Sequence, residues 1–331
     1  MDKLIKSMRL LFLPAFLIIL LNITGCNKND NDITSANSGT EDEYLQNEAI
    51  QSTDSSNNDD NELLGSQISD YSDDGAVFNN SNEPLTSYDS LRFYGRRVTS
   101  VTVTTTFTVD TDTLKTLLVK RTISGNFIIK GYTGGVLDSI SKPYTEVQNR
   151  TASFKRVART EVHRRNWRLY QVSAVDGQTT SPQQGKSNIV MNKVEIYKND
   201  NLLLTLNGPD FTSNVFTTRY FNGEGIFNWG RNNNIKVKVY LTSNQSDTDL
   251  VAFHWARNSF GFHRVAFTMT SSTPNGGNYD RVYEKSFNIY GSHRFGIFNS
   301  YISANTRKSL WDNNISEFSS TYMGAPYRIS F

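Results

Sequence analysis

The 331-residue chain carries 34 lysines and arginines against 32 aspartates and glutamates, which leaves a formal net charge of only +2. Its single cysteine excludes a disulfide framework within the chain. Although the total charge is close to zero, acidic and basic residues are concentrated in different parts of the chain. Residues 27–90 hold fifteen acids and one lysine, a net charge of −14, whereas residues 91–331 hold 30 basic and 16 acidic residues, a net charge of +14.

The chain begins with a short cationic leader, in which Lys3, Lys6 and Arg9 precede twelve apolar residues at 10–21. At a helical rise of about 1.5 Å per residue, twelve residues are too short to cross a hydrocarbon layer of about 30 Å. That length is typical of the hydrophobic region of a secretory signal peptide. We therefore predict that residues 1–25 are a signal peptide.

The signal peptide ends in Ile23, Thr24 and Gly25, and Cys26 follows directly. This tetrapeptide resembles the lipobox of bacterial lipoproteins, although Ile23 stands where leucine is commoner. The resemblance implies that the Cys26 thiol receives a diacylglyceryl group and that the mature chain carries further acyl chains such as palmitate. Two or more acyl chains hold a protein on a membrane stably. The alternative is a free thiol behind an ordinary secretory signal.

Residues 26–90 are rich in asparagine, serine, aspartate and glutamate, and they contain few apolar residues. Such a composition buries too little apolar surface to offset the entropy of the chain, so we predict a disordered acidic linker that acts as a stalk. Lys28 and the acids that follow Cys26 resemble the signal that sends lipoproteins of the Bacteroidetes type to the outside of the outer membrane. A cell-surface location is therefore expected, with the periplasmic face as the alternative.

From residue 91 onward, threonine, valine, isoleucine, phenylalanine and tyrosine alternate with polar residues in short runs, which predicts β-strands. Turn signals such as Gly134-Gly135, Asp176-Gly177 and Asn222-Gly223 separate these runs. The expected strands include residues 98–103, 126–130, 167–172, 194–197, 235–241 and 327–331. This rhythm predicts an all-β fold.

The strand rhythm also resembles that of immunoglobulin-like β-sandwich modules, without the Cys…Trp…Cys signature of antibody domains. The polar stretch 179–187 contains Pro182 and Gly185 and precedes a new strand at Ile189. We therefore expect two modules, at residues 91–185 and 186–331, with one large sandwich as the alternative. Each is long enough to bury a core without disulfides or metals.

The segment 150–168 (RTASFKRVARTEVHRRNWR) carries seven basic residues and one acid. Arginine presents a fork of donors to sulfate, phosphate or carboxylate, and an aromatic ring stacks on a sugar. This pattern predicts a carbohydrate or polyanion site formed by Arg156, Arg159, Arg164, Arg165 and Trp167. The alternatives are a solvated sheet face, and an intramolecular attraction between the acidic linker and the basic body.

No recognised catalytic motif is present, so no catalytic residue, metal ligand or cofactor is assigned. Two DTD triplets, Asp110–Asp112 and Asp247–Asp249, leave calcium as an alternative, because carboxylate oxygens are calcium ligands. His254 and His263 stand nine residues apart and are interpreted as ordinary sheet residues rather than zinc ligands. An unrecognised hydrolase remains a further alternative.

These observations together predict a lipid-anchored protein of the bacterial outer membrane with a non-enzymatic role in adhesion or envelope structure. The expected partners are the membrane, through the lipid at Cys26, and a polysaccharide or other anionic surface polymer. Nucleic acid is not expected as a partner, because the predicted signal peptide exports the protein.

Overall fold

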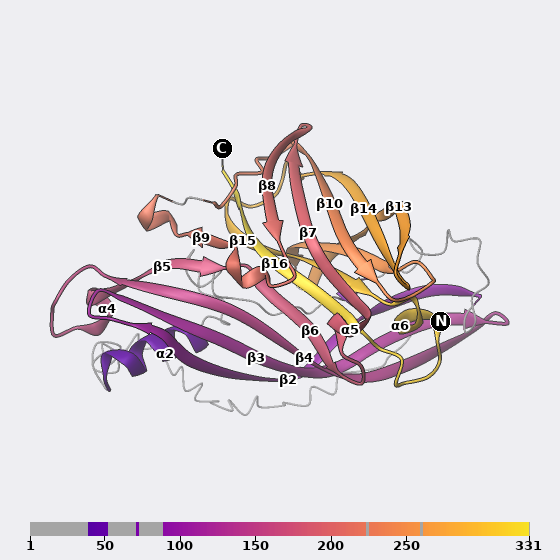
Figure 1. Cartoon of the computed structure of the whole chain (residues 1–331), viewed down its shortest axis with the longest axis horizontal. Helices are drawn as coiled ribbons and strands as arrows, with labels where there is room; N and C mark the ends of the chain where they lie inside the picture. The colour runs from indigo at the N-terminus through magenta and orange to yellow at the C-terminus, as the bar shows by residue number, and fades with distance from the viewer. Residues whose placement is uncertain (1–38, 52–70, 73–88, 223–224, 259–260, 331) are drawn as a thin grey trace, which may run out of the picture.

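The computed structural model describes residues 39–51, 71–72, 89–222, 225–258 and 261–330 (Figure 1). Most of its regular structure is antiparallel strand, which confirms the all-β prediction. The strands are β1 (Tyr71–Ser72), β2 (Ser90–Asp110), β3 (Leu114–Thr133), β4 (Val136–Arg156), β5 (Trp167–Ser173), β6 (Val175–Ser181), β7 (Ile189–Lys198), β8 (Asn201–Asn207), β9 (Val215–Thr217), β10 (Asn234–Ser243), β11 (Leu250–Asn258), β12 (Gly261–Ala266), β13 (Thr268–Asn275), β14 (Asn278–Asn288), β15 (Gly296–Asn305) and β16 (Ser320–Ile329). The helices are α2 (Glu41–Gln51), α4 (His163–Asn166), α5 (Gly185–Asn188) and α6 (Arg307–Trp311), with the 3-10 turns η2 (Phe211–Ser213) and η3 (Arg219–Phe221).

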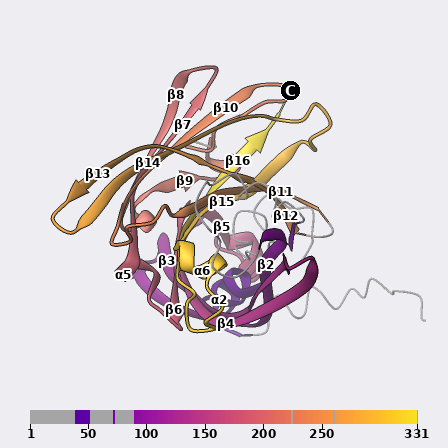
Figure 2. The same cartoon turned by 90° about the vertical axis from the view of Figure 1, so that its right-hand side faces the viewer.

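Three long neighbouring strands, β2, β3 and β4, form one wall of the molecule. Burial alternates along β3, so that Leu117, Val119 and Ile123 are buried and the residues between them are more exposed. A period of two is what a strand with one covered face requires. The wall curls around the interior (Figure 2), where apolar side chains of α2 pack at one end and those of α6 at the other.

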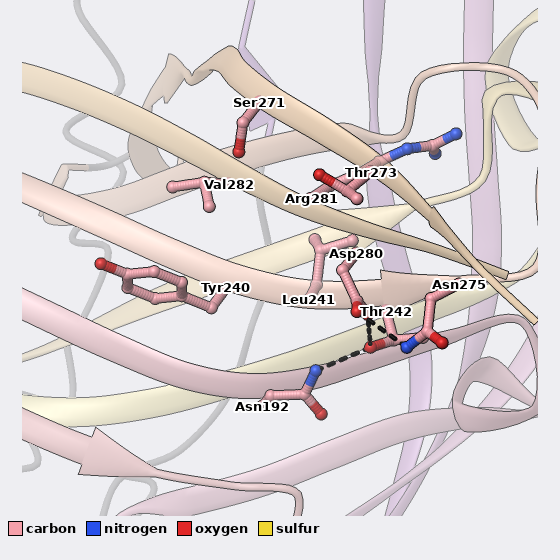
Figure 3. Close-up of a pocket in the computed structure, with 10 residues that line it drawn as sticks. All are labelled: Asn192, Tyr240, Leu241, Thr242, Ser271, Thr273, Asn275, Asp280, Arg281 and Val282. Carbon is pink, nitrogen blue, oxygen red and sulfur yellow. Dashed lines mark hydrogen bonds between the residues drawn. The ribbon is translucent and has the colours of Figure 1, made fainter.

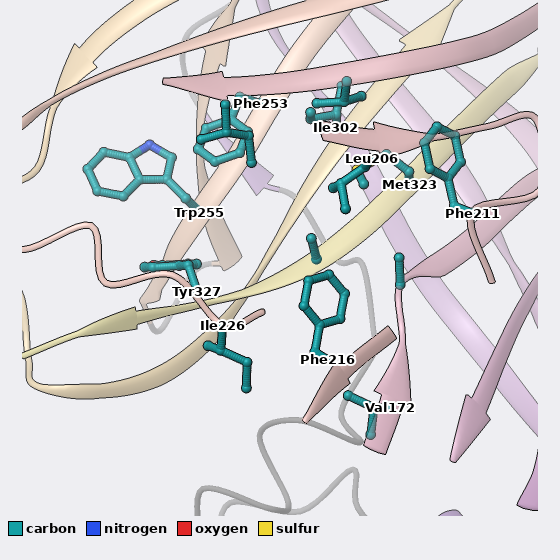
Figure 4. Packing of buried hydrophobic residues seen from close by; sticks show 14 of the residues in the cluster. Val172, Leu206, Phe211, Phe216, Ile226, Phe253, Trp255, Ile302, Met323 and Tyr327 are labelled. Atoms are coloured by element: carbon teal, nitrogen blue, oxygen red, sulfur yellow. The ribbon is translucent and has the colours of Figure 1, made fainter. Parts of the chain in front are cut away.

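The strands form two sheets. The large sheet has eleven strands in the order β1-β2-β3-β4-β6-β16-β15-β11-β12, with β5 paired to β4 and β9 paired to β5. A five-stranded sheet, in the order β13-β14-β10-β7-β8, packs against the part of the large sheet formed by β16, β15 and β11. The rings of Phe287 on β14 and Phe253 on β11 stack with centroids 4.9 Å apart. Ile302 and Met323 from the large sheet belong to the same hydrophobic cluster (Figure 4). Burial of apolar area contributes about 25 cal/mol per Å², so this cluster stabilises the packing of the two sheets.

Strand β16 lies between the five-stranded sheet and the β2–β4 wall, and nine of its ten residues are buried. Its two faces differ in chemistry. Met323 and Ala325 belong to the hydrophobic core, whereas Ser320 accepts a hydrogen bond of 2.7 Å from Arg96 on β2. The strand therefore belongs to a middle layer that is covered on both sides.

The interface between this middle layer and the wall contains buried charge. The Arg96 guanidinium also donates to Asn305 Oδ1 at 3.2 Å and lies 3.7 Å from the Glu146 carboxylate, and these two charged side chains are 1% and 0% exposed. Buried ions are costly unless hydrogen bonds and an opposite charge satisfy them. We infer that this network fixes the position of the wall relative to the middle strands.

The structure does not divide at residue 185. Strand β6, from the expected first module, pairs with β16 from the expected second, and the large sheet continues through both. The polar stretch 179–187 is a connection inside one sheet assembly, because α5 turns the chain directly from β6 into β7. The two-module division is therefore corrected, and the finer prediction of immunoglobulin-like modules is not confirmed.

Helix α2 falls within residues 26–90, where composition predicts a disordered linker. The prediction is wrong for Glu41–Gln51, because Leu45 and Ala49 are fully buried in the main hydrophobic core. A capping box begins the helix: Thr40 N donates to Glu43 Oε2 at 2.7 Å, and Glu43 N donates to Thr40 Oγ1 at 3.2 Å. Strand β1 pairs with β2, and residues 52–70 and 73–88 lie outside the described residues.

Candidate functional site

Two of the predicted binding residues, Arg156 and Trp167, face each other across strands β4 and β5. The Trp167 ring is 2% exposed and belongs to the core, so a sugar in solution has no access to its face. The Arg156 guanidinium lies 4.4 Å from the centroid of this ring, within the range of a cation–π contact. The indole ring therefore packs against the Arg156 guanidinium and is not exposed for stacking with a sugar.

Arg156 is already occupied by a carboxylate from helix α2. Its Nη1 and Nη2 donate to Glu41 Oε1 and Oε2 at 2.9 and 2.6 Å, the bidentate geometry that arginine favours. This interaction with Arg156 is the main cause that lowers the pKa of Glu41 to about 2, with a weaker hydrogen bond from Asn166 and an opposing effect of burial. Asp42 pairs with Lys115 beside it. The Arg156 guanidinium is therefore occupied by a carboxylate of the protein's own acidic segment.

The other predicted binding residues are dispersed. Arg159 pairs with Asp112 in the loop before β3. Arg164 and Arg165 lie in α4, where both are exposed and make no side-chain hydrogen bond or ion pair with a described residue. The five residues therefore do not form one site, because Arg156 and Arg159 are neutralised while Arg164 and Arg165 remain in solvent.

The remaining sequence-based assignments have mixed outcomes. Cys26 and the signal peptide lie outside the described residues. Asp110 pairs with Lys115 at 2.7 Å, and the buried Asp249 pairs with Arg281 at 2.7 Å. Within the described ranges no three acidic, histidine or cysteine side chains gather in a way that would hold a metal ion. The calcium alternative therefore gains no support from either DTD triplet.

The structure reveals an open groove that the sequence did not predict, on the outer face of the five-stranded sheet (Figure 3). Its volume is about 530 Å³. Side chains from four strands line it: Asn192 from β7, Tyr240 and Thr242 from β10, Asp280 and Val282 from β14, and Ser271, Thr273 and Asn275 from β13. Strand pairing shifts after Tyr240 and after Met269. Such irregularities increase the local twist, which hollows this face of the sheet.

Hydrogen bonds fix the polar side chains along the floor of the groove (Figure 3). Asn192 Nδ2 donates to Thr242 Oγ1 at 2.9 Å, and Thr242 Oγ1 donates to Asp280 Oδ1 at 2.7 Å. Asn275 Nδ2 donates to Asp280 Oδ2 at 2.9 Å. The hydrogen bonds from Thr242 and then from Asn275 lower the pKa of Asp280. This carboxylate is therefore ionised at neutral pH, and an ionised carboxylate accepts hydrogen bonds.

Tyr240 lies at one end of the groove, and its side chain is fixed by contacts with Glu195 and Lys193. Its hydroxyl donates to Glu195 Oε2 at 2.8 Å, and Lys193 Nζ lies 4.0 Å from the centroid of its ring. Burial, followed by the hydrogen bond to Glu195, raises the pKa of Tyr240 to about 12. Tyr197 donates to the same Glu195 oxygen at 2.8 Å from outside the groove. The ring of Tyr240 is thus fixed beside the polar floor.

The groove could not be read from the sequence, because its residues lie in regular strands and form no motif. The sequence feature that bears on the groove is the alternation of apolar and polar residues at 235–241, which places Tyr240 on the strand face opposite Val237 and Val239. Alternation identifies the outer face, but the strand pairing that brings Asn192, Thr242 and Asp280 together spans almost ninety residues of chain.

No family model matches the chain, no curated protein is significantly similar to it, and no solved structure matches its fold. In the part of the chain that the structure describes, no helix is long and apolar enough to span a membrane.

Proposed function

We propose that the chain is a lipid-anchored protein of the bacterial cell envelope, exposed at the surface of the outer membrane, with a non-enzymatic role in adhesion or envelope structure. The proposed activity is the binding of a neutral carbohydrate in the groove between Asn192, Tyr240, Thr242 and Asp280. The lipobox-like Ile23–Cys26 supports the anchor, and the groove supports the activity.

The chemistry of the groove carries this proposal. A sugar presents hydroxyl groups that donate and accept hydrogen bonds, and the groove offers a carboxylate, amides and hydroxyls beside one aromatic ring. Ser271 and Thr273 make no side-chain hydrogen bond with a described residue, so their hydroxyls are available. Because the floor is already ordered, a ligand meets prearranged groups and little further ordering is required.

The charges of the surrounding sheet favour a neutral ligand over a polyanion. Lys193 pairs with Glu195 and Lys238 with Glu284, each at 2.8 Å. The groove itself contributes the negative charge of Asp280, whereas Arg281, which also lines it, pairs with the buried Asp249. A polyanion would therefore meet balanced charge and one carboxylate, whereas a neutral sugar forms hydrogen bonds with the same groups.

The same lining favours binding over cleavage. Asp280 is the one carboxylate among the described residues that line the groove, whereas glycoside hydrolysis ordinarily uses a pair of carboxyl groups that flank the scissile bond. A hydrolase would also need one carboxyl group with a raised pKa as the acid, and the pKa of Asp280 is lowered.

The groove is tested by affinity electrophoresis of the mature chain through gels that contain neutral polysaccharides, with titration calorimetry on any that retard it. We expect Tyr240→Ala and Asp280→Asn each to weaken binding about tenfold or more, because each removes a fixed contact. Tyr197→Ala is the matched control, since it removes the same ring and the same hydrogen bond to Glu195 outside the groove. Retardation that survives Tyr240→Ala, or a panel with no retardation, would overturn the proposed activity.

The anchor is tested separately in cells fed an alkyne-tagged fatty acid. The wild-type chain should become labelled and fractionate with outer membranes, and Cys26→Ser should abolish both, because Cys26 is the only thiol. Surface location is then checked by protease access to intact cells. An unlabelled wild-type chain would contradict the anchor and leave the groove proposal unaffected.

A further inference from the structure

The end of the molecule that carries α4 and α2 combines exposed cations that lack a partner among the described residues with aromatic rings at the surface. Lys155 and Arg168 are direct partners in the pairing of β4 with β5, and both are exposed. They and the α4 residues Arg164 and Arg165 form no side-chain hydrogen bond or ion pair with a described residue. Two like charges directly opposite each other on a sheet are unfavourable, so a negatively charged partner would relieve this arrangement.

Aromatic side chains border these cations. Lys155 Nζ lies 5.4 Å from the centroid of the Tyr170 ring and 5.8 Å from that of Phe221. Tyr220 is 66% exposed and packs edge-on against Phe221, with centroids 4.9 Å apart. We define the basic aromatic patch as Lys155, Arg164, Arg165, Arg168, Tyr220 and Phe221. Tyrosine is favoured at the headgroup level of a bilayer, and arginine and lysine are attracted to anionic lipids.

The docked helix α2 determines which end of the molecule the anchor holds. Its first turn is fixed to α4 and its surroundings: Glu41 binds Arg156, and Gly39 O lies 3.2 Å from His163 Nε2. Only residues 27–40 then separate Cys26 from the body, and fourteen residues span at most about 50 Å when fully extended. A tether that reached to Ser90 would span up to about 220 Å by the same measure. The short tether meets the body beside α4, so this end is the one held near the bilayer.

We propose that the basic aromatic patch rests on the phosphate-bearing headgroups of an anionic lipid surface, so that the protein is held by its acyl anchor and by this patch together. The proposal rests on the anchor at Cys26 and is independent of the groove. In Figure 1 the α4 end and strands β13 and β14 of the groove lie toward opposite ends of the long axis. This arrangement keeps the groove accessible while the patch faces lipid.

The test uses the chain from Cys26 to Phe331, coupled through its one thiol to a maleimide lipid. The vesicles contain either phosphatidylcholine alone or phosphatidylcholine with 30% phosphatidylglycerol. Hydroxyl-radical labelling and peptide mass spectrometry then compare Tyr220 with Tyr279, which is partly exposed at the β13–β14 hairpin. We expect Tyr220 to be labelled at least threefold less on the anionic vesicles, with Tyr279 unchanged.

Two triple variants make the result specific. Arg164→Ser with Arg165→Ser and Arg168→Ser should abolish the protection of Tyr220. The matched control, Arg97→Ser with Lys120→Ser and Lys130→Ser, removes three exposed cations from β2 and β3 and should retain it. Equal labelling of Tyr220 on both vesicles would overturn the proposal, as would protection that survives loss of the three patch arginines. Chemical coupling replaces cellular lipidation, so this failure is distinct from failure of the anchor.

Discussion

The α4 end and the grooved face of the five-stranded sheet differ in how their basic side chains are paired with carboxylates. At the α4 end, Arg156 and Lys115 bind acids of helix α2, and Arg164, Arg165 and Arg168 remain without a described partner. On the grooved face Lys193, Lys236 and Lys238 each pair with a neighbouring carboxylate. Both regions are rich in basic residues, but the exposed cations without a described hydrogen-bond or ion-pair partner lie at the α4 end.

This difference shows that a cluster of arginines in a sequence does not by itself define a binding site. The residues that a polyanion was expected to meet are partly neutralised within the chain, because Glu41 reaches Arg156 from 115 residues away. The exposed Arg164 and Arg165 lie in α4, where His163 Nε2 is 3.2 Å from the carbonyl oxygen of Gly39, two residues before helix α2. The following predictions test the two sides of this comparison.

The largest effect is expected beneath the groove. The Arg281 side chain is buried, where its Nη1 binds Asp249 Oδ2 at 2.7 Å and its Nη2 donates to the carbonyl of Gln245 at 2.7 Å. Arg281→Met leaves Asp249 as an unpaired buried charge, which should cost about 3–5 kcal/mol of unfolding free energy. Lys236→Met, which removes a partner of the exposed Asp200, should lower the unfolding free energy far less, because solvent screens this ion pair. Urea denaturation measures both, and equal losses would contradict the distinction.

A smaller effect is expected for the apolar contact of helix α2. Leu45 is fully buried, so Leu45→Ala should weaken docking of the helix by about 2–3 kcal/mol. Cleavage by a glutamate-specific protease at Glu41, Glu43 or Glu48 should then accelerate about 30-fold or more, because the protease acts on the undocked helix. Leu202→Ala, at a residue that is 53% exposed, is the control and should leave the rate unchanged. An unaltered rate for Leu45→Ala would mean that the helix is not held by the core.

Acid should weaken α2 docking by a lesser amount. The pKa of Glu41 is lowered from 4.5 to about 2 by its hydrogen bonds with Arg156, so its stabilising contribution is complete above pH 4.5 and is lost as the pH falls toward 2. Because Glu41 is partly exposed, solvent screening reduces this contribution to about 1 kcal/mol. Amide exchange of residues 41–51 between pH 5 and 2.5, corrected for intrinsic rates, should show this loss. Arg156→Met should remove the pH dependence, and a wild-type profile in that variant would contradict the assignment.

The smallest effect on stability is expected for the patch cations. Arg164→Ser with Arg165→Ser should change the unfolding free energy by less than about 0.5 kcal/mol, because both side chains are exposed and lack described partners. Thermal unfolding measures this change. A loss above 1 kcal/mol would show that these arginines stabilise the fold and are not held available for a partner.

The sequence predicted the class of the fold because burial alternates with period two on strands with one covered face, as on β3 and β10. The sequence did not predict the middle layer. Strand β16 is buried on both faces, so its burial does not alternate, and it pairs with β6 from the other side of the expected boundary at residue 185. The sequence-based prediction also failed at α2, where Leu45 and Ala49 are the only two residues of the described helix in the main core, within an acidic surrounding. A prediction from the composition of a sequence window gives two apolar residues little weight among many polar and acidic ones. It cannot include the large core that these two residues contact in the folded chain.

The central claim is that α2 docks on the body, since the occupied Arg156 site and the short tether both depend on it. Hydrogen–deuterium exchange of residues 26–331 at neutral pH tests this most directly. An isolated eleven-residue helix is marginal in water, so protection can come only from docking. We predict that residues 41–51 exchange at least 30-fold more slowly than an unstructured peptide and that Leu45→Asp removes this protection. Exchange of these residues at unstructured rates in the wild-type chain would contradict the account.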